Sequence, residues 1–204
     1  MNSLPACAGL ILAGGRGQRL GGRDKALVEL AGQPLLAHVA ARLKPQAAPL
    51  IISANGDPAR FAAFGLTVLA DETADFAGPL AGILAAMDHL AAEGSSVGHL
   101  LSAPTDCPFL PHDLAARLSA AMRDTGAAVA FASSAGRDHP VIALWSLALR
   151  DALRQALAQG RNGVMAFIGR QSHASTAWPV EPCDPFFNIN TPEDLAAAER
   201  ICRC

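Results

Sequence analysis

Short apolar runs alternate with amphipathic stretches along most of this 204-residue chain. Residues 8–13, 50–53, 67–70 and 99–102 are apolar segments of strand length, and each ends near glycine or polar residues. In the stretches that follow, leucine and methionine recur every three or four residues, as in helices that bury one face. Strands that alternate with helices need crossover connections, so the pattern predicts an α/β fold: a mostly parallel twisted sheet with helices on both faces.

The same spacing predicts the later elements. One helix is indicated by Leu80, Ile83, Leu84, Met87 and Leu90, and a second by Leu114, Leu118 and Met122. Residues 127–132 and 141–145 are predicted strands around a turn at Gly136, and a helix over residues 147–158 should stop at Gly160. The last helix should begin at Thr191 as N-cap, followed by Pro192 and two acids. With no internal repeat and no linker-like stretch, we expect one domain over residues 1–204.

Composition excludes several classes of protein. A formal net charge of −2 provides no general field for nucleic acid, so no nucleic-acid partner is expected. No apolar run approaches the roughly 20 residues that span a bilayer, so no membrane partner is expected. Residues 4–13 lack a preceding basic residue and read as a buried strand rather than a signal peptide. The five cysteines are scattered, which favours a reducing cytoplasm over a disulfide or zinc framework.

A glycine-rich, basic loop follows the first predicted strand, at residues 12–25. In open parallel sheets ligands bind beyond the carboxyl ends of strands, where this loop should lie. Its glycines let backbone N–H groups approach phosphate oxygens closely. Arg16, Arg19, Arg23 and Lys25 add four positive charges against the single acid Asp24. The segment therefore predicts an anion-binding loop, although a flexible loop with solvated arginines is the ordinary alternative.

Two well-known glycine motifs do not fit. A Walker A loop requires glycine and lysine followed by serine or threonine, and the chain has no such triplet. The dinucleotide pattern would need glycine at the position of Leu20.

The loop instead resembles the nucleotidyltransferase pattern of the molybdenum cofactor guanylyltransferases. That pattern has leucine, alanine and two glycines, then arginine, Asp-Lys and a Gly-x-Pro-Leu-Leu segment, here running from Leu12 to Leu36. The resemblance implies a Rossmann-like nucleotidyltransferase fold whose N-terminal part binds nucleotide and whose C-terminal part binds the acceptor. It implies that Arg19 and Lys25 neutralise a triphosphate. The matching nucleotide-binding residues in the loop are Leu12, Ala13, Gly14 and Gly15. Two glycines, rather than the Ala-Gly of relatives that use CTP, imply GTP.

The same resemblance places acids and amides around the nucleotide. Asp106, which precedes Cys107-Pro-Phe-Leu, corresponds to the family's metal ligand, and Mg²⁺ is the implied cofactor. Asp71 corresponds to a residue near the nucleotide. An acid after a strand is otherwise most often a turn former or helix cap. Ser53 and Asn55 align with an Asn-x-Asn contact to the nucleoside, in which Ser53 replaces the first amide; a structural role is the alternative for Asn55.

The acceptor side rests on the last third of the chain. By resemblance, Arg137, His139, Asn188 and Asn190 bind a molybdenum-bound molybdopterin. The two asparagines have an ordinary alternative as caps of the final helix, and a histidine before proline usually marks a turn or strand edge. Cys107 has no partner histidine or second cysteine nearby in sequence, so packing is its expected role.

Together these residues imply an enzyme that transfers GMP from GTP to the terminal phosphate of molybdopterin and releases pyrophosphate. Cofactor-delivery proteins or molybdoenzymes are further partners implied by that product. Two alternatives stay open: a CTP-dependent or sugar-phosphate nucleotidyltransferase of the same fold, and a non-catalytic cofactor-binding chaperone. Arg19, Lys25 and Asp106 favour the enzyme, because a pure binder has no need of a metal site.

Overall fold

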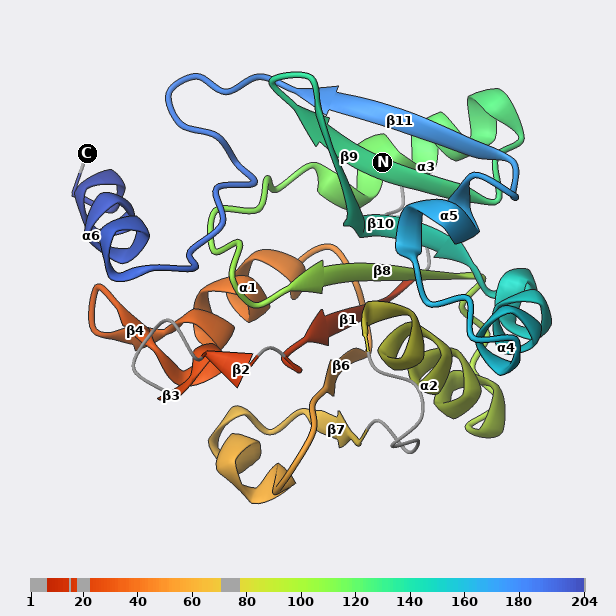
Figure 1. The fold of residues 1–204 in the computed structure, drawn as a ribbon, viewed down its shortest axis with the longest axis horizontal. Helices are drawn as coiled ribbons and strands as arrows, with labels where there is room; N and C mark the ends of the chain where they lie inside the picture. The colour runs from red at the N-terminus through yellow and green to blue at the C-terminus, as the bar shows by residue number, and fades with distance from the viewer. Residues whose placement is uncertain (1–6, 15, 18–22, 71–77, 204) are drawn as a thin grey trace.

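A seven-stranded sheet forms the centre of the molecule in a computed structural model that describes residues 7–14, 16–17, 23–70 and 78–203 (Figure 1). Its order is β11-β9-β10-β8-β1-β6-β7. Neighbouring strands are parallel except at β10, which is antiparallel to both β8 and β9. The mostly parallel sheet expected from the sequence is thus confirmed. The strands are β1 (Cys7–Leu12), β6 (Leu50–Ser53), β7 (Thr67–Leu69), β8 (His99–Pro104), β9 (Val129–Ser134), β10 (Arg137–Ser146) and β11 (His173–Trp178).

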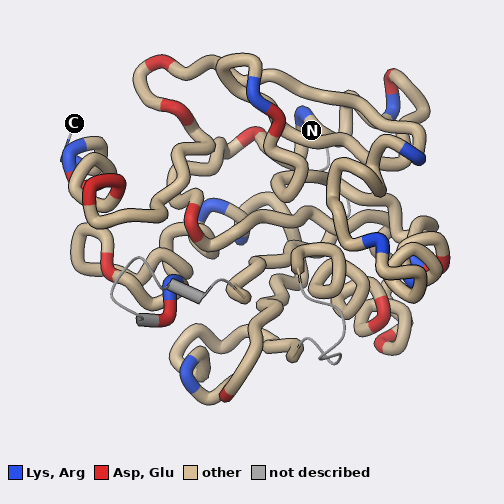
Figure 2. The backbone as a smooth tube through the Cα atoms, in the orientation of Figure 1, with Lys and Arg blue, Asp and Glu red and all other residues tan. Residues whose placement is uncertain are grey.

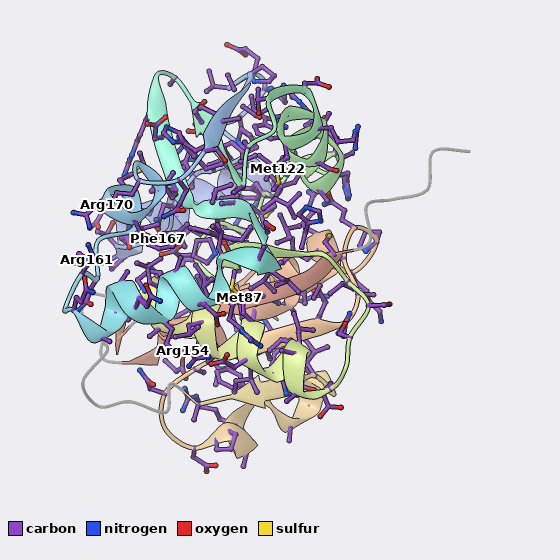
Figure 3. The ribbon with its side chains drawn as sticks, turned by 90° about the vertical axis from the view of Figure 1, so that its right-hand side faces the viewer. Met87, Met122, Arg154, Arg161, Phe167 and Arg170 are labelled. Atoms are coloured by element: carbon purple, nitrogen blue, oxygen red, sulfur yellow. The ribbon has the colours of Figure 1, made fainter. Side chains whose placement is uncertain are left out.

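Helices cover both faces of the sheet, because the central strands are apolar on both sides. In β1, Cys7 and Ile11 pack with α1 (Leu35–Leu43) and α3 (Leu114–Thr125), whereas Ala8 and Leu10 pack on the opposite face. That face is covered by α2 (Pro79–Ala92), α4 (Arg150–Ala158) and α5 (Val164–Ile168). Met122 of α3 and Met87 of α2, labelled in Figure 3, belong to these two separate apolar clusters.

The final helix, α6 (Pro192–Ile201), packs away from the main sheet against a small hairpin of β4 (Glu29–Leu30) and β5 (Gln33–Pro34), at the left of Figure 1. Leu30, Ile189 and Ala198 are fully buried between them. The helix begins as expected: the Thr191 hydroxyl accepts a hydrogen bond from the Asp194 N–H, and Asp194 accepts one in return from the Thr191 N–H. This capping box holds the segment before α6 in a defined position.

Most strand and helix predictions agree with the structure to within about two residues, but β10 begins at Arg137, four residues before the predicted strand, and α4 begins at Arg150, three residues after the predicted helix start. The turn at Gly136 joins β9 to β10, and helix α4 ends before Gly160. Three main elements were not predicted: α1, α5 and β11. β11 is an edge strand with alternating exposed and partly buried residues, so its sequence lacks the apolar run that marks a central strand.

Shorter elements also escaped the sequence analysis. They are the hairpin of β2 (Arg16–Gly17) and β3 (Arg23–Asp24) and the 3-10 helices η2 (Lys25–Leu27), η3 (Pro58–Phe64) and η4 (Leu147–Leu149). No helix in the described ranges is long and apolar enough to cross a membrane.

A buried polar network joins β8 to β10. The Ser102 hydroxyl, which has no exposed surface, donates to the Val141 carbonyl at 2.7 Å and accepts from the Trp145 indole N–H at 2.8 Å. A buried indole N–H without a partner would lose the free energy of its solvation. Ser102 therefore provides the hydrogen-bond acceptor for Trp145, the largest side chain of the core, and links β10 to β8.

We expect Ser102→Ala to lower the free energy of unfolding by about 1–3 kcal/mol, because it leaves the Trp145 N–H buried and unpaired. Urea denaturation of Ser102→Ala, Trp145→Phe and the double variant measures the coupling between the two residues. The double variant should lose less stability than the sum of the two single variants. Strict additivity would show that the bond contributes nothing.

Candidate active site

A pocket of about 700 Å³ opens where the carboxyl ends of β6, β1 and β8 meet the first half of β10. The chain order reverses at this edge: β6 and β7 lie on one side of β1, and β8 lies on the other. Ligands of open α/β sheets bind at such switch points. The pocket is lined by Leu12, Gly14, Lys25, Ser53, Asn55, Gly78, Pro79, Pro104, Thr105, Asp106, Cys107, Arg137, Asp138, His139, Pro140, Val141, Ile142 and Asn188.

Local rather than global charge must attract a ligand here. Basic and acidic positions are interspersed along the described backbone (Figure 2), as the net charge of −2 predicts. The pocket is lined by two cations, Lys25 and Arg137, and by two acids, Asp106 and Asp138. An anion that enters the pocket therefore responds to individual cations at short range.

Lys25 is the best-fixed of these cations. Its ammonium Nζ lies 2.6 Å from Asp106 Oδ2 and donates a second hydrogen bond, also of 2.6 Å, to Asn190 Oδ1. The side chains of Lys25 and Asp106 are only 11% and 17% exposed, so this ion pair is screened far less than one on the surface. The contact joins the glycine-rich loop, the end of β8 and the segment before α6.

Asp24 fixes the backbone from which Lys25 projects. One carboxylate oxygen accepts a hydrogen bond from the Ala26 N–H and caps η2, and the other lies 2.5 Å from Arg60 Nε in an ion pair. The Arg60 guanidinium also donates to the backbone carbonyls of Asn55 and Asp57. Arg60 therefore ties the loop after β6, which holds Asn55, to the loop that holds Lys25.

Asn188 and Asn190 flank the buried Ile189, whose N–H donates to the Asp106 carbonyl at 2.9 Å. Neither asparagine side chain caps α6, since Thr191 does so. Asn188 lines the pocket, and its Oδ1 is buried without a hydrogen-bond partner. Asn190 lies outside the pocket lining and bonds Lys25. The hydrogen bond from the Asn190 backbone N–H lowers the pKa of Asp194, which keeps that capping carboxylate charged.

His139 forms part of the opposite wall, on β10. Its Nε2 lies 2.8 Å from the Ser134 hydroxyl, which also lies 3.1 Å from Asp184 Oδ2. The ring packs at 4.9 Å from the Phe186 ring. Burial lowers the pKa of His139, and the negative charge of Asp184 partly opposes that effect.

Cys107 is buried, with its thiol near Asp106 Oδ1 at 3.6 Å and the Phe186 carbonyl at 3.7 Å. Burial, reinforced by the Asp106 carboxylate, raises the pKa of this thiol well above its usual value. A thiol that stays protonated is a poor nucleophile, in agreement with the packing role expected for Cys107.

The structure brings most of the predicted site residues together. Those that line the pocket are Leu12, Gly14, Lys25, Ser53, Asn55, Asp106, Arg137, His139 and Asn188. Ala13 is buried behind the wall, where its N–H donates to the Ser53 carbonyl. Gly15, Arg19 and Asp71 lie outside the described residues.

Several residues around the pocket escaped the sequence analysis. Thr105 lines the pocket and donates its N–H to the Leu12 carbonyl, whereas Arg60, Ser134 and Asp184 act on the pocket residues from behind. Only Thr105 carried a sequence signal, because it directly precedes Asp106. The other three depend on contacts that no local pattern reveals.

Gly82 of α2 sets the depth of the pocket floor. A Cβ at this position would lie 2.4 Å from Ser53 Oγ and 2.8 Å from Leu12 Cδ2, both on pocket residues. Absence of a side chain thus allows α2 to approach the ends of β1 and β6 closely.

We expect Gly82→Ala to displace Leu12 and Ser53 and to weaken nucleotide binding by about tenfold or more, a change near 1.4 kcal/mol. Calorimetric titration with GTP and Mg²⁺ measures the change. Gly98→Ala is the matched control, since a Cβ there meets no atom within 4 Å. Equal GTP affinity in both variants would show that Leu12 and Ser53 do not shape the nucleotide site.

Comparison with known proteins agrees with this geometry. The family model described as the MobA-like NTP transferase domain matches residues 9–176. Molybdenum cofactor guanylyltransferase of Rhodopseudomonas palustris (strain BisB5) is 56% identical over 97% of this chain and 94% of its own length. The protein of the same name from Bradyrhizobium sp. (strain ORS 278) is 53% identical over 96% and 93%.

A solved structure shares the fold over its whole length. Molybdopterin-guanine dinucleotide biosynthesis protein A from Archaeoglobus fulgidus superimposes with a TM-score of 0.76 and 26% identity, covering 96% of this chain and 98% of its own. Family match, full-length identity and fold agree with the resemblance in the glycine-rich loop. This chain is a nucleotidyltransferase that belongs to the molybdenum cofactor guanylyltransferase family, within the MobA-like NTP transferases.

Proposed function

We propose that this pocket transfers GMP from GTP to the terminal phosphate of molybdenum-bound molybdopterin and releases pyrophosphate. The observation that carries the proposal is the position of Lys25, held at 2.6 Å from both Asp106 and Asn190 where the glycine-rich loop meets the end of β8. A fixed ammonium beside a carboxylate suits a triphosphate and its cation. The names of the relatives supply the guanylyl group and the acceptor.

The reaction needs little covalent chemistry from the protein. An oxygen of the acceptor phosphate attacks the α-phosphorus of GTP, and the bond from that phosphorus to the pyrophosphate oxygen breaks. A phosphate monoester is already largely deprotonated at neutral pH, so the attacking oxygen requires no general base. Rate enhancement should come from the orientation of two anions and from the stabilisation of charge on the leaving pyrophosphate.

Lys25 is placed to stabilise that charge. An ammonium has three N–H donors, and the contacts with Asp106 and Asn190 use two of them. The third is available to a phosphate oxygen in the pocket that Lys25 lines. We propose that Arg19, from the same glycine-rich segment of the sequence, adds a second cation, and that Leu12, Ala13, Gly14 and Gly15 bind the triphosphate.

The residues fit a divalent cation with oxygen ligands. Mg²⁺ is bound by one or two carboxylates together with phosphate oxygens and water, and Asp106 presents a carboxylate to the pocket. No cluster of three or more histidine, cysteine or acidic residues occurs in the described part of the chain, which suits a metal held largely by its substrate. Bound there, the ion would offset the repulsion between the acceptor phosphate and the triphosphate. Asp106 would then exchange its contact with Lys25 for the metal.

The other pocket residues divide between the two substrates. We assign Ser53, Asn55 and Asp71 to the nucleoside side, because Ser53 ends β6, Asn55 follows that strand, and both line the pocket beside Leu12 and Gly14. Arg137, His139 and Asn188 are assigned to the acceptor, since they lie on β10 and the segment before α6. We assign Asn190 to the positioning of Lys25 instead of the acceptor, because its Oδ1 accepts a hydrogen bond from the Lys25 ammonium.

The cellular setting follows from the product. A protein-bound cofactor has to reach its enzyme, so delivery proteins or molybdoenzymes are the expected protein partners. Four described cysteines are free thiols, which supports a reducing cytoplasm as the compartment.

Asp106→Asn should keep the fold but lower turnover by about 100-fold or more, because an amide binds Mg²⁺ weakly and leaves Lys25 without its counter-charge. Pyrophosphate release with GTP and molybdopterin is measured across a Mg²⁺ titration, alongside the melting temperature. Asp124→Asn, on an exposed position of α3, is the matched control. Turnover near the normal value in Asp106→Asn would remove this residue from the metal site.

Nucleotide preference separates this proposal from its nearest alternative. We expect GTP to support pyrophosphate release in the presence of molybdopterin, and CTP to support it at least about 100-fold less efficiently, a difference of near 2.7 kcal/mol. The measurement is kcat/KM for each of the four nucleoside triphosphates with and without molybdopterin. Higher efficiency with CTP would instead identify a cytidylyltransferase of the same fold.

A further inference from the structure

Three side chains form a hydrogen-bonded chain behind the acceptor side of the pocket. Ser134, at the end of β9, is 2% exposed and connects His139 Nε2, at 2.8 Å, to Asp184 Oδ2, at 3.1 Å. Asp184 is itself fixed, because its Oδ1 accepts the Phe186 N–H at 2.9 Å. Of these three side chains, His139 lines the pocket. Ser134 and Asp184 can therefore affect a ligand through the histidine.

The positions of the protons follow from counting donors. A carboxylate only accepts hydrogen bonds, and a serine hydroxyl has one hydrogen to donate. The Ser134 hydrogen must point to Asp184, so the Ser134 oxygen accepts on its other side. His139 Nε2 must then carry a proton and donate it to Ser134. This assignment follows from the network, as histidine tautomers generally do.

The neutral form of the ring leaves a lone pair on Nδ1. Half-burial beside Phe186 lowers the pKa of His139, and the neighbouring charges act in both directions: Asp184 and Asp138 raise it, whereas Arg137 lowers it. With Nε2 engaged by the buried Ser134, Nδ1 is the nitrogen left for a ligand. At His139 this wall thus presents a hydrogen-bond acceptor, on the same strand as the cation Arg137.

We propose that His139 accepts a hydrogen bond at Nδ1 from an N–H group of the acceptor's ring system, and that Ser134 and Asp184 are positioning residues that hold the required tautomer. This inference rests on the proposed function, and it identifies the ring system of the acceptor as the part that His139 recognises. A lone pair repels phosphate oxygens but suits the ring N–H and amino groups of a reduced pterin. The phosphate of the acceptor should therefore lie away from His139 Nδ1, toward the cations Lys25 and Arg137 that also line the pocket.

Nitrogen-15 NMR of the histidine side chains tests the tautomer without any turnover. The His139 signals are those absent from His139→Gln, and they should show a protonated Nε2 and an unprotonated Nδ1 at neutral pH. Ser134→Ala should abolish this preference. Asp184→Asn should invert it, because an amide can donate to Ser134 and turn the hydroxyl hydrogen toward Nε2. A protonated Nδ1 in the wild-type protein, alone or together with Nε2, would overturn the proposal.

Steady-state kinetics test the consequence for the substrate. Ser134→Ala should raise the KM for molybdopterin about tenfold, as expected for one lost hydrogen bond, and leave the KM for GTP within about twofold. Ser175→Ala removes an exposed hydroxyl from the neighbouring strand β11, where it donates to Ser133, and serves as the control. An equal rise of both KM values, in parallel with a lower melting temperature, would show a purely structural role for Ser134.

A tetrahydropterin without a phosphate separates the failure of this inference from the failure of the proposed function. It should shift the His139 Nδ1 resonance of the wild-type protein and leave that of Ser134→Ala unchanged. If the wild-type protein fails to transfer GMP to molybdopterin, the proposed function is wrong. The titration still reports whether His139 Nδ1 accepts a hydrogen bond from a pterin ring. If inorganic phosphate shifts the resonance and the tetrahydropterin does not, His139 binds the anionic end and the inference is wrong.

Discussion

The ion pair between Lys25 and Asp106 holds the candidate site together. Its two residues are 81 positions apart, and the hydrogen bond from Lys25 to Asn190 spans 165 positions. A partly buried charge pair is costly to desolvate and is worth keeping mainly where its charges have a further use. Here the pair keeps the Lys25 ammonium and the Asp106 carboxylate next to each other until a ligand binds. A triphosphate with its metal can separate the two and satisfy both, so ligand binding replaces the contact instead of leaving a buried charge unpaired.

Two layers behind the pocket keep this arrangement in register. On the nucleotide side, Arg60 connects the Asn55 loop to Asp24, next to Lys25. On the acceptor side, Ile189 bonds the backbone of Asp106, and the capping box at Thr191 holds the segment that follows. Each contact contributes only a modest free energy. Together they fix the positions of the pocket side chains, and catalysis that depends on orientation is sensitive to small errors in those positions.

Periodicity and end signals were sufficient to predict the fold class and most elements. Apolar runs such as β1 and β8 are buried on both faces, so their sequences mark them directly, whereas β11 at the sheet edge has no such run. The glycine-rich loop and Asp106 were found because their chemistry is local in sequence. The contacts of Arg60, Ser134 and Asp184 depend on segments that meet only in the folded chain. Asn190 was expected at the acceptor from the family resemblance, which could not reveal that its side chain accepts a hydrogen bond from Lys25.

The two ends of the pocket thus differ in kind as well as in position. The glycine-rich loop and Lys25 offer positive charge and N–H donors, which suit phosphates. At the β10 wall, the proton count through Ser134 leaves a lone pair on His139, and Asn188 adds a buried oxygen without a partner. Both of these groups accept hydrogen bonds, whereas Arg137 on the same strand as His139 is a cation. Under the proposed function, the contrast between Lys25 and His139 would orient a substrate that has a phosphate at one end and ring N–H groups at the other. That orientation points its phosphate toward the nucleotide, as the displacement at the α-phosphorus requires.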